Sequence, residues 1–180
     1  MFNFDMEFAF KGESGKHRPE VVSDTLLLTI PPLREGSPYH VLESIEEINS
    51  YVEEPLRETV RSLYKKNIET TSSSANKNDV ERKFASIGIL YDQLSLENKA
   101  IADMLVKEKA ADKEYFLFPP EVGEFAFSIE TCKSFMRTKE YKVLNILLGV
   151  NGETTAGDIE EKFAIITKKF KDQSPEKTGK

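Results

Sequence analysis

The residues with the greatest capacity for covalent or acid–base chemistry are one cysteine, Cys132, and two histidines, His17 and His40. Cys132 follows an alternating apolar segment at the start of a helical pattern, where a helix N-terminus can lower the pKa of a thiol and create a nucleophile. Neither histidine is near it in the sequence, and both lie in segments typical of an exposed turn or a first helical turn. A single cysteine is more often a small buried apolar residue. We therefore predict no catalytic residue, with an enzyme that uses Cys132 as an alternative.

Patterns that hold metals or nucleotides are absent from the sequence. It contains no Cys-x-x-Cys, His-x-x-x-His or Glu-x-x-His pair, so the usual ligands for zinc or a di-iron centre are missing. It also contains no glycine-rich phosphate loop and no Gly-x-Ser-x-Gly elbow. We predict no cofactor and no small-molecule ligand. Carboxylates that the fold brings together would still allow an enzyme with a hard metal, which is a second form of the enzyme alternative.

Three of the Glu-x-Lys triplets in the chain have the spacing that metal-dependent nucleases use on a strand to position a general base. They lie at Glu81–Lys83, Glu97–Lys99 and Glu160–Lys162. All three fall in segments with a helical pattern, where such spacings arise from ordinary surface charge. The triplets therefore do not favour a nuclease.

Charge is unevenly distributed along the chain. Twenty-five Lys and Arg oppose 31 Asp and Glu, for a net charge of −6; residues 35–58 are strongly acidic and residues 162–180 are basic. A modestly acidic chain lacks the broad basic surface that neutralises phosphates, which argues against nucleic-acid binding. No run of apolar residues approaches the ~18 that a membrane helix needs. The chain has one cysteine and no Asn-x-Ser/Thr glycosylation site, which fits a reducing compartment. We predict a cytoplasmic, intracellular protein without a membrane segment.

The elements that would position any functional side chain begin with an N-terminal hairpin over residues 1–30. Apolar side chains alternate strictly with polar ones from Phe2 to Phe10, and alternation returns from Thr25 to Ile30. Phe2, Phe4 and Phe8 would form an aromatic patch on a terminal strand that could pair with another chain. Alternatively, these phenylalanines form the core of the domain.

A helical region is predicted over residues 38–111. One apolar stripe runs from Val41 to Leu63 with an interruption expected at Pro55, and residues 66–77 form a serine-rich flexible loop. A second stripe with heptad-like spacing runs from Val80 to Leu105 and includes Asn98, which predicts one continuous helix. A break with Ser95 as the cap of a second helix is the competing interpretation. The seam pairs either with a second subunit, where a buried Asn would fix the register, or with the first stripe of the same chain.

A second hairpin followed by helices is predicted over residues 114–172. Tyr115–Phe118 and Phe125–Ile129 have the pattern of short strands, and a helical pattern runs from Glu130 to Met136. The apolar run from Tyr141 to Val150 fits either a buried strand or a buried helix. Thr155 and Asp158 form a capping box before a terminal helix with Ile159, Phe163, Ile166 and Phe170 on one face. Residues 173–180 are expected to be a disordered tail.

Together these patterns predict one α+β domain over residues 1–172. Two antiparallel β-hairpins form a small sheet, and long amphipathic helices pack on it as a helical hairpin or bundle. The expected function is that of a non-catalytic protein-binding or assembly protein that acts as a homo-oligomer. The alternatives are a small phage or mobile-element accessory protein that inhibits a host factor, and the enzyme described above. The candidate interaction residues are Phe2, Phe4, Phe8, Phe84, Tyr91, Asn98 and Ile101.

Overall fold

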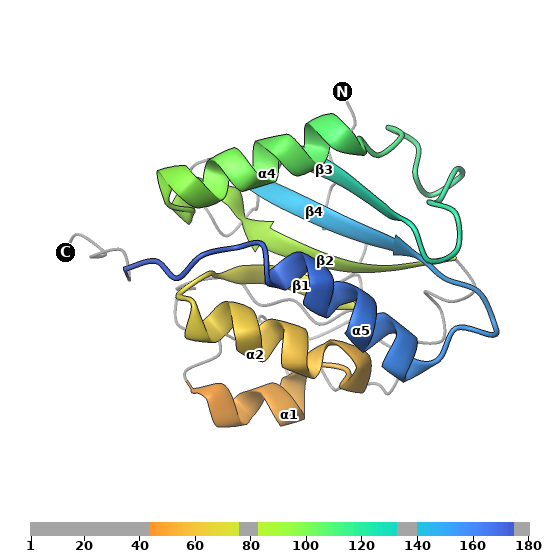
Figure 1. Cartoon of the computed structure of the whole chain (residues 1–180), viewed down its shortest axis with the longest axis horizontal. Coiled ribbons are helices and arrows are strands. Elements are labelled where there is room, and N and C mark those ends of the chain that lie inside the picture. Colours follow the sequence, from red (N-terminus) through yellow and green to blue (C-terminus); the bar gives the residue numbers. More distant parts are fainter. Residues whose placement is uncertain (1–43, 76–82, 133–139, 175–180) are drawn as a thin grey trace, which may run out of the picture.

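A computed structural model describes residues 44–75, 83–132 and 140–174 of the chain. These residues form an α+β fold with a four-stranded antiparallel sheet in the order β1-β2-β4-β3 (Figure 1). The strands are β1 (Thr70–Ser74), β2 (Phe84–Leu90), β3 (Phe125–Cys132) and β4 (Tyr141–Gly149). The two central strands, β2 and β4, are distant in sequence, and their pairing joins the two halves of the described chain.

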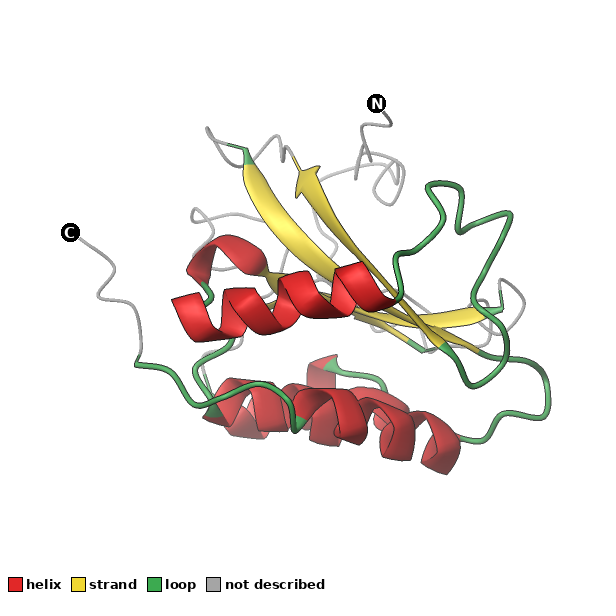
Figure 2. Cartoon of the chain, turned by 45° about the horizontal axis from the view of Figure 1, so that its top comes forward, coloured by secondary structure: helices red, strands yellow, loops and turns green. Residues whose placement is uncertain are grey.

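Helices cover one face of this sheet (Figure 2). The α-helices are α1 (Ile48–Tyr51), α2 (Arg57–Lys65), α4 (Leu96–Glu108) and α5 (Ala156–Thr167), and the short 3₁₀ helices are η2 (Ile45–Glu47), η3 (Glu54–Leu56) and η4 (Tyr91–Gln93). Within the described ranges the longest helix, α4, has 13 residues. No helix in these ranges is both long enough and apolar enough to cross a membrane.

Alternation along β4 divides the buried side chains between the two faces of the sheet. Leu144, Ile146 and Leu148 belong to the main core beneath the helices, whereas Val143 and Leu147 lie on the opposite face and are also buried. A strand buried on both faces has a nearly continuous apolar sequence. This property explains why the run from Tyr141 to Val150 could not be assigned from its sequence, and the structure shows that it is a strand.

The serine-rich segment predicted as a loop is in fact strand β1. Its backbone pairs with β2 from Thr70 to Ser74, with Thr71 as an extra residue in the register. A Cβ built on Gly88 would lie 2.5 Å from Thr71 Oγ1 and 2.6 Å from Ser72 Oγ. The strand therefore depends on a glycine in its neighbour, and its low hydrophobicity concealed it because pairing uses backbone groups.

The continuous helix predicted from Val80 to Leu105 is also wrong. Phe84–Leu90 is strand β2, and a new helix begins after Ser95, whose Oγ accepts a hydrogen bond of 3.2 Å from the Asn98 amide. The cap at Ser95 and the helix after it, which the competing interpretation predicted, are therefore confirmed, whereas the segment before Ser95 is not a helix. The apolar spacing misled because nearly every side chain of β2 is apolar or small, so that a three-and-four pattern fits it by chance.

The other predicted elements were partly confirmed. The helical stripe is interrupted between Val52 and Glu54, as Pro55 predicted, and the capping box of Thr155 and Asp158 is present. Residues 115–118 are turns and not a strand, so the second hairpin consists of β3 and β4. Residues 130–132 extend β3, so they do not begin the predicted helix. The N-terminal hairpin with Phe2, Phe4 and Phe8, and both histidines, lie outside the described residues.

Candidate functional site

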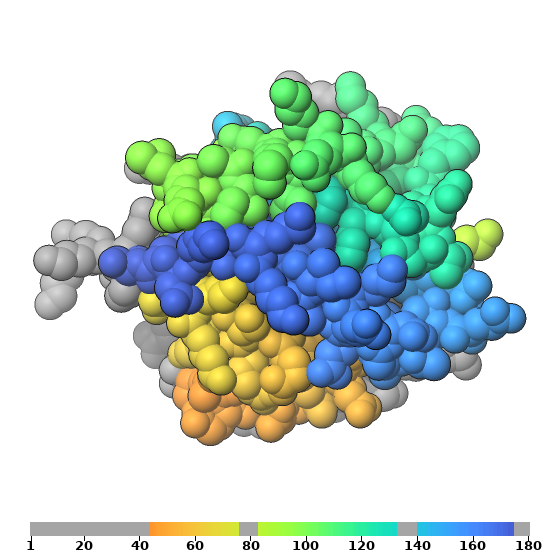
Figure 3. All heavy atoms as spheres, viewed as in Figure 1, coloured from red at the N-terminus to blue at the C-terminus, as the bar shows by residue number. Residues whose placement is uncertain are grey.

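A loop of residues 112–124, here called the aromatic loop, connects α4 to β3 and exposes large apolar side chains. Leu117 is 72% exposed, Phe118 is 61% exposed and Val122 is 56% exposed. Large exposed apolar groups that cluster in one short segment are typical of interaction sites, whereas isolated ones are ordinary. The loop is drawn in blue-green beyond the end of α4 in Figures 1 and 3.

Backbone hydrogen bonds fix both ends of the aromatic loop to the sheet. At its start, the Ala111 amide donates to the Phe127 carbonyl at 2.8 Å, and the Phe127 amide donates to the Lys109 carbonyl at 2.9 Å. At its end, the Gly123 amide donates to the Gly149 carbonyl at 2.8 Å, and the Gly149 amide donates to the Glu124 carbonyl at 2.9 Å. A loop whose ends are pinned close together is compact and defined, as in Ω-loops.

Gly149 allows the loop to lie directly against β4. A Cβ at this position would overlap the carbonyl oxygens of Pro120 and Glu121 and would lie 2.6 Å from the Glu121 carbonyl carbon. The two consecutive prolines, Pro119 and Pro120, restrict the backbone of the same segment. The side chains of Leu117 and Phe118 are therefore carried by a stiff segment, and stiffness lowers the entropy cost of binding.

Two aromatic side chains of the loop anchor it to the sheet. Tyr115 is buried, and its ring meets Phe84 edge-on with the ring centroids 5.6 Å apart. Phe116 also lies against Phe84, at 6.0 Å. Burial raises the pKa of the Tyr115 hydroxyl well above its ordinary value, and the negative charge of Glu130 adds to this shift. Tyr115 and Phe116 thus hold the base of the loop, while Leu117 and Phe118 form its tip.

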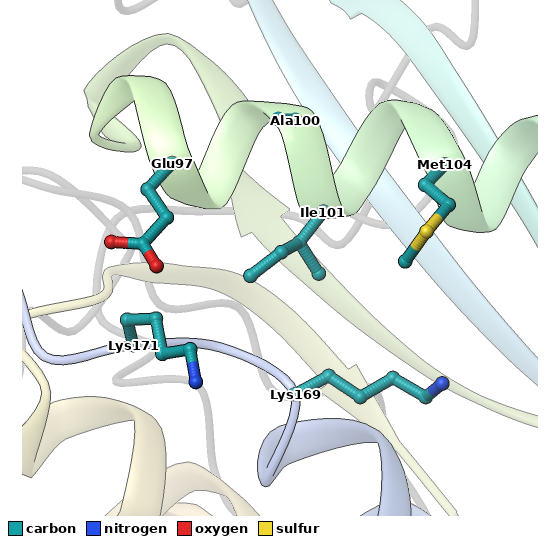
Figure 4. Close-up of a pocket in the computed structure, with 6 residues that line it drawn as sticks. All are labelled: Glu97, Ala100, Ile101, Met104, Lys169 and Lys171. Carbon is teal, nitrogen blue, oxygen red and sulfur yellow. The ribbon is translucent and has the colours of Figure 1, made fainter.

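A groove lies between α4 and the segment that follows α5, with a volume of about 430 Å³ (Figure 4). Ala100, Ile101 and Met104 of α4 supply its apolar surface, and Met104 is 45% exposed. Lys169 and Lys171 line the opposite side, and Glu97 lies at one end. Figure 3 shows α4 in green beside the C-terminal segment in blue. The groove therefore combines an apolar floor with a basic edge.

Asn98 joins the two sides of this groove, because it links α4 to the segment that follows α5. Its side chain is fully buried; Nδ2 donates to the Lys171 carbonyl at 2.9 Å, and Oδ1 accepts from the Lys171 amide at 2.8 Å. Nδ2 also donates to Gln173 Oε1 at 3.0 Å. The side-chain amide of Asn98 thus donates to the backbone carbonyl of Lys171 and accepts from its backbone amide, so both polar atoms of this buried side chain have a hydrogen-bond partner.

Gln173 extends this polar network to two other turns of the chain. Its Nε2 donates to the carbonyls of Asn67 and Gln93, and its Oε1 accepts from the Ser95 amide at 2.9 Å. Lys66 Nζ donates to the carbonyls of Thr167 and Phe170, which caps the C-terminus of α5. Gln173, which we expected at the start of a disordered tail, is therefore tied into the fold.

The structure places the predicted interaction residues at separate points. Phe84 is buried at the start of β2, and Tyr91 lies in η4, where its hydroxyl donates to Asp103 Oδ1 at 2.9 Å. Asn98 is satisfied within its own chain, and Ile101 lines the groove. The four side chains do not form one helical seam, because Phe84 and Tyr91 precede α4.

The sequence interpretation missed Leu117, Phe118 and Val122 as candidate interaction residues. The available signal was a run of large apolar residues beside two prolines and between acidic residues. A double proline is incompatible with a central strand and marks a turn.

Cys132 does not occupy the helix N-terminus that motivated its interpretation as a nucleophile. It ends β3 and is half-buried, and burial together with the nearby Glu130 charge raises its pKa to about 11. At neutral pH such a side chain is a thiol and not the reactive thiolate. Of the three triplets named above, two lie on helices, in α4 and α5, and Glu81 of the third lies outside the described residues. A fourth triplet, Glu140–Lys142, which the sequence interpretation missed, lies at the start of strand β4. The described part of the chain contains no group of three His, Cys, Asp or Glu residues that could hold a metal.

Comparison with known proteins gives no further information: the chain matches no protein-family model, no curated protein and no solved structure.

Proposed function

We propose that this chain is a non-catalytic protein-binding protein and that the aromatic loop is its binding surface. The observation that carries the proposal is the exposure of Leu117, Phe118 and Val122 on a loop that is fixed at both ends. A chain gains nothing in its own stability from apolar groups that remain in water, whereas a partner that covers them gains their burial.

The energy available from the loop tip can be bounded. Full burial of a large apolar side chain is worth about 1.5–3 kcal/mol, so the exposed parts of these three side chains are worth roughly 3–6 kcal/mol. Association itself costs an estimated ~4–15 kcal/mol. The loop tip alone therefore supports weak binding, and polar contacts around it or repeated contacts are needed for a stable complex.

The charges around the loop favour a protein partner with a basic rim. Residues 112–124 contain four acids and one lysine. One of the acids, Glu124, pairs with Lys109, and this contact lowers the Glu124 pKa. The remaining acids lie before and after Leu117 and Phe118 in the sequence and would be repelled by an anionic membrane surface. A protein surface with an apolar pocket and basic side chains has the complementary chemistry.

Photo-cross-linking from the loop tip tests this proposal. A photoreactive amino acid replaces Leu117 in one sample and Glu153 in the control, because Glu153 is exposed and lies outside the loop. We expect protein adducts of discrete mass at position 117 only. An excess of native chain should suppress an adduct with a different protein, whereas an excess of chain carrying Leu117→Asp and Phe118→Asp should not; an adduct between two copies of the chain should persist in both cases, because each added chain still has an intact groove. Equal labelling from both positions, or no protein adduct at position 117, would contradict the proposal.

A further inference from the structure

We infer that the partner of the aromatic loop is a second copy of this chain, and that the loop tip docks into the groove between α4 and the C-terminal segment. This inference rests on the proposed function and names the partner. It joins two surfaces that are separate within one molecule, because no residue of the aromatic loop lines the groove.

The apolar surfaces of the aromatic loop and of the groove are complementary. The loop presents Leu117 and Phe118 at its tip, and the groove presents Ile101 and Met104 on its floor. A volume of about 430 Å³ is at the small end of the range for binding pockets, so it accommodates one or two large side chains and not a whole helix. Methionine is unbranched and adaptable, which suits it to the reception of an aromatic side chain.

The charges of the aromatic loop and of the groove are also complementary. Outside the pair between Lys109 and Glu124, the loop retains three acids, Asp112, Glu114 and Glu121, against Lys113 within the loop and Lys162 of α5, which lies beside Gly123. The groove has Lys169 and Lys171 against Glu97. An apolar segment flanked by acids therefore meets an apolar floor with a basic edge on one side, an arrangement that fixes orientation and disfavours other partners.

The aromatic loop does not line the groove of its own molecule. Hydrogen bonds to Phe127 and Gly149 pin the loop beside β3 and β4, beyond the end of α4 (Figure 1). The groove lies along α4 beside Lys169 and Lys171 (Figure 4). Because both ends of the loop are held there and no residue of the loop lines the groove, its tip is left for another molecule.

Each molecule offers one loop and one groove. Two molecules that dock reciprocally form a symmetric dimer with two such contacts, and molecules that do not dock reciprocally join head to tail in an open chain or a larger ring. The weakness of a single contact is then offset by the number of contacts in the assembly.

Mixing two complementary variants tests the inference. The loop variant carries Leu117→Ser and Phe118→Ser, and the groove variant carries Met104→Glu and Lys169→Glu; all four residues are exposed. A control variant carries Leu96→Ser and Ile165→Ser, which removes exposed apolar side chains that do not line the loop or the groove. Circular dichroism establishes that each variant is folded, and sedimentation velocity measures its mass.

We expect the native chain and the control variant to assemble with rising concentration and each binding variant alone to remain monomeric, with self-association weakened at least tenfold. An equimolar mixture of the two binding variants should form dimers and nothing larger, because it contains one intact loop and one intact groove per pair.

Assembly of the loop variant at the native level, or a mixture that stays monomeric, would overturn the inference. A native chain that is monomeric at every concentration would do the same. If the adduct from position 117 then contained a different protein, the proposed function would stand and only the identity of the partner would be wrong. If no protein adduct formed, both would fail.

Discussion

Replacement of Gly149 by alanine should detach the aromatic loop without changing any side chain within it. A Cβ at this position would lie 2.6 Å from the Glu121 carbonyl carbon, whereas real Cβ atoms essentially never approach closer than 3.0 Å. The obstructing atoms belong to the backbone of Pro120 and Glu121, which cannot rotate away as a flexible side chain could. The loop must therefore move away from β4.

The expected loss of stability follows from three contributions. Movement of the loop breaks the hydrogen bonds from Gly123 to Gly149 and from Gly149 to Glu124, each worth about 1 kcal/mol net. Residual overpacking adds about 1–3 kcal/mol. Alanine restricts the unfolded chain and returns about 0.4–1 kcal/mol. The free energy of unfolding should fall by about 2–5 kcal/mol, and the Tm by roughly 4–18 °C.

Urea denaturation of Gly149→Ala beside the matched variant Gly152→Ala measures this loss. Nothing lies within 4 Å of a Cβ at Gly152, so that variant should remain within about 0.5 kcal/mol of the native chain. Hydrogen exchange at the Gly123 amide should accelerate in Gly149→Ala only, because that amide loses its acceptor. Equal stability of the two variants, with unchanged exchange at Gly123, would refute the placement of the loop against β4.

Three further expectations concern the network, a helix cap and the thiol. Asn98→Ala should lower the free energy of unfolding by about 2–4 kcal/mol in urea denaturation, because the Lys171 amide and carbonyl both lose their partner; a loss below about 1 kcal/mol would contradict that pairing. Thr155→Ala should cost about 1 kcal/mol through loss of the capping box. Hydrogen bonds from Thr155 lower the pKa of Asp158 in the folded state. The stabilisation from this carboxylate is therefore present above the unfolded pKa of 3.8 and is lost as the pH falls through the lower folded pKa. The difference in unfolding free energy between the native chain and Thr155→Ala should narrow in acid, and a constant difference across an acid titration would contradict the cap. Alkylation of Cys132 at pH 8 should be about 100-fold slower in the folded chain than in urea, because its pKa rises from 9.0 to about 11, and equal rates would exclude that burial.

The elements that could be predicted from the sequence depend on local signals. Helix α5 is specified by the capping box of Thr155 and Asp158 and by an apolar stripe with helical spacing, and all of these residues lie within a few turns. The interruption at Pro55 is equally local, because proline removes a backbone donor whatever surrounds it.

The elements that could not be predicted depend on partners distant in sequence. Strand β1 exists because β2 offers its backbone and because Gly88 leaves room for Thr71 and Ser72. Hydrophobicity does not report either condition. Strand β2 in turn is buried on both faces, so its apolar residues fit a helical period as well as an extended one.

The candidate site shows the same limit. The sequence indicated that Asn98 is buried among apolar residues, and it is, but its partner is the backbone of Lys171 and not an asparagine of a second subunit. Tyr115 and Leu117 belong to the same run of large apolar residues, yet Tyr115 is buried against Phe84 and Leu117 is exposed. The path of the loop over β4 determines which of the two side chains is buried and which is exposed, and the sequence does not reveal that path.

The most direct test of the account is the absolute mass of the native chain in solution, measured by light scattering on a size-exclusion column over a wide concentration range, beside the chain with Leu117→Ser and Phe118→Ser. Docking of the loop into a second copy requires that the mass of the native chain rise above 20.5 kDa with concentration, while the double variant stays at that mass. Identical masses for the two chains at every concentration would contradict it.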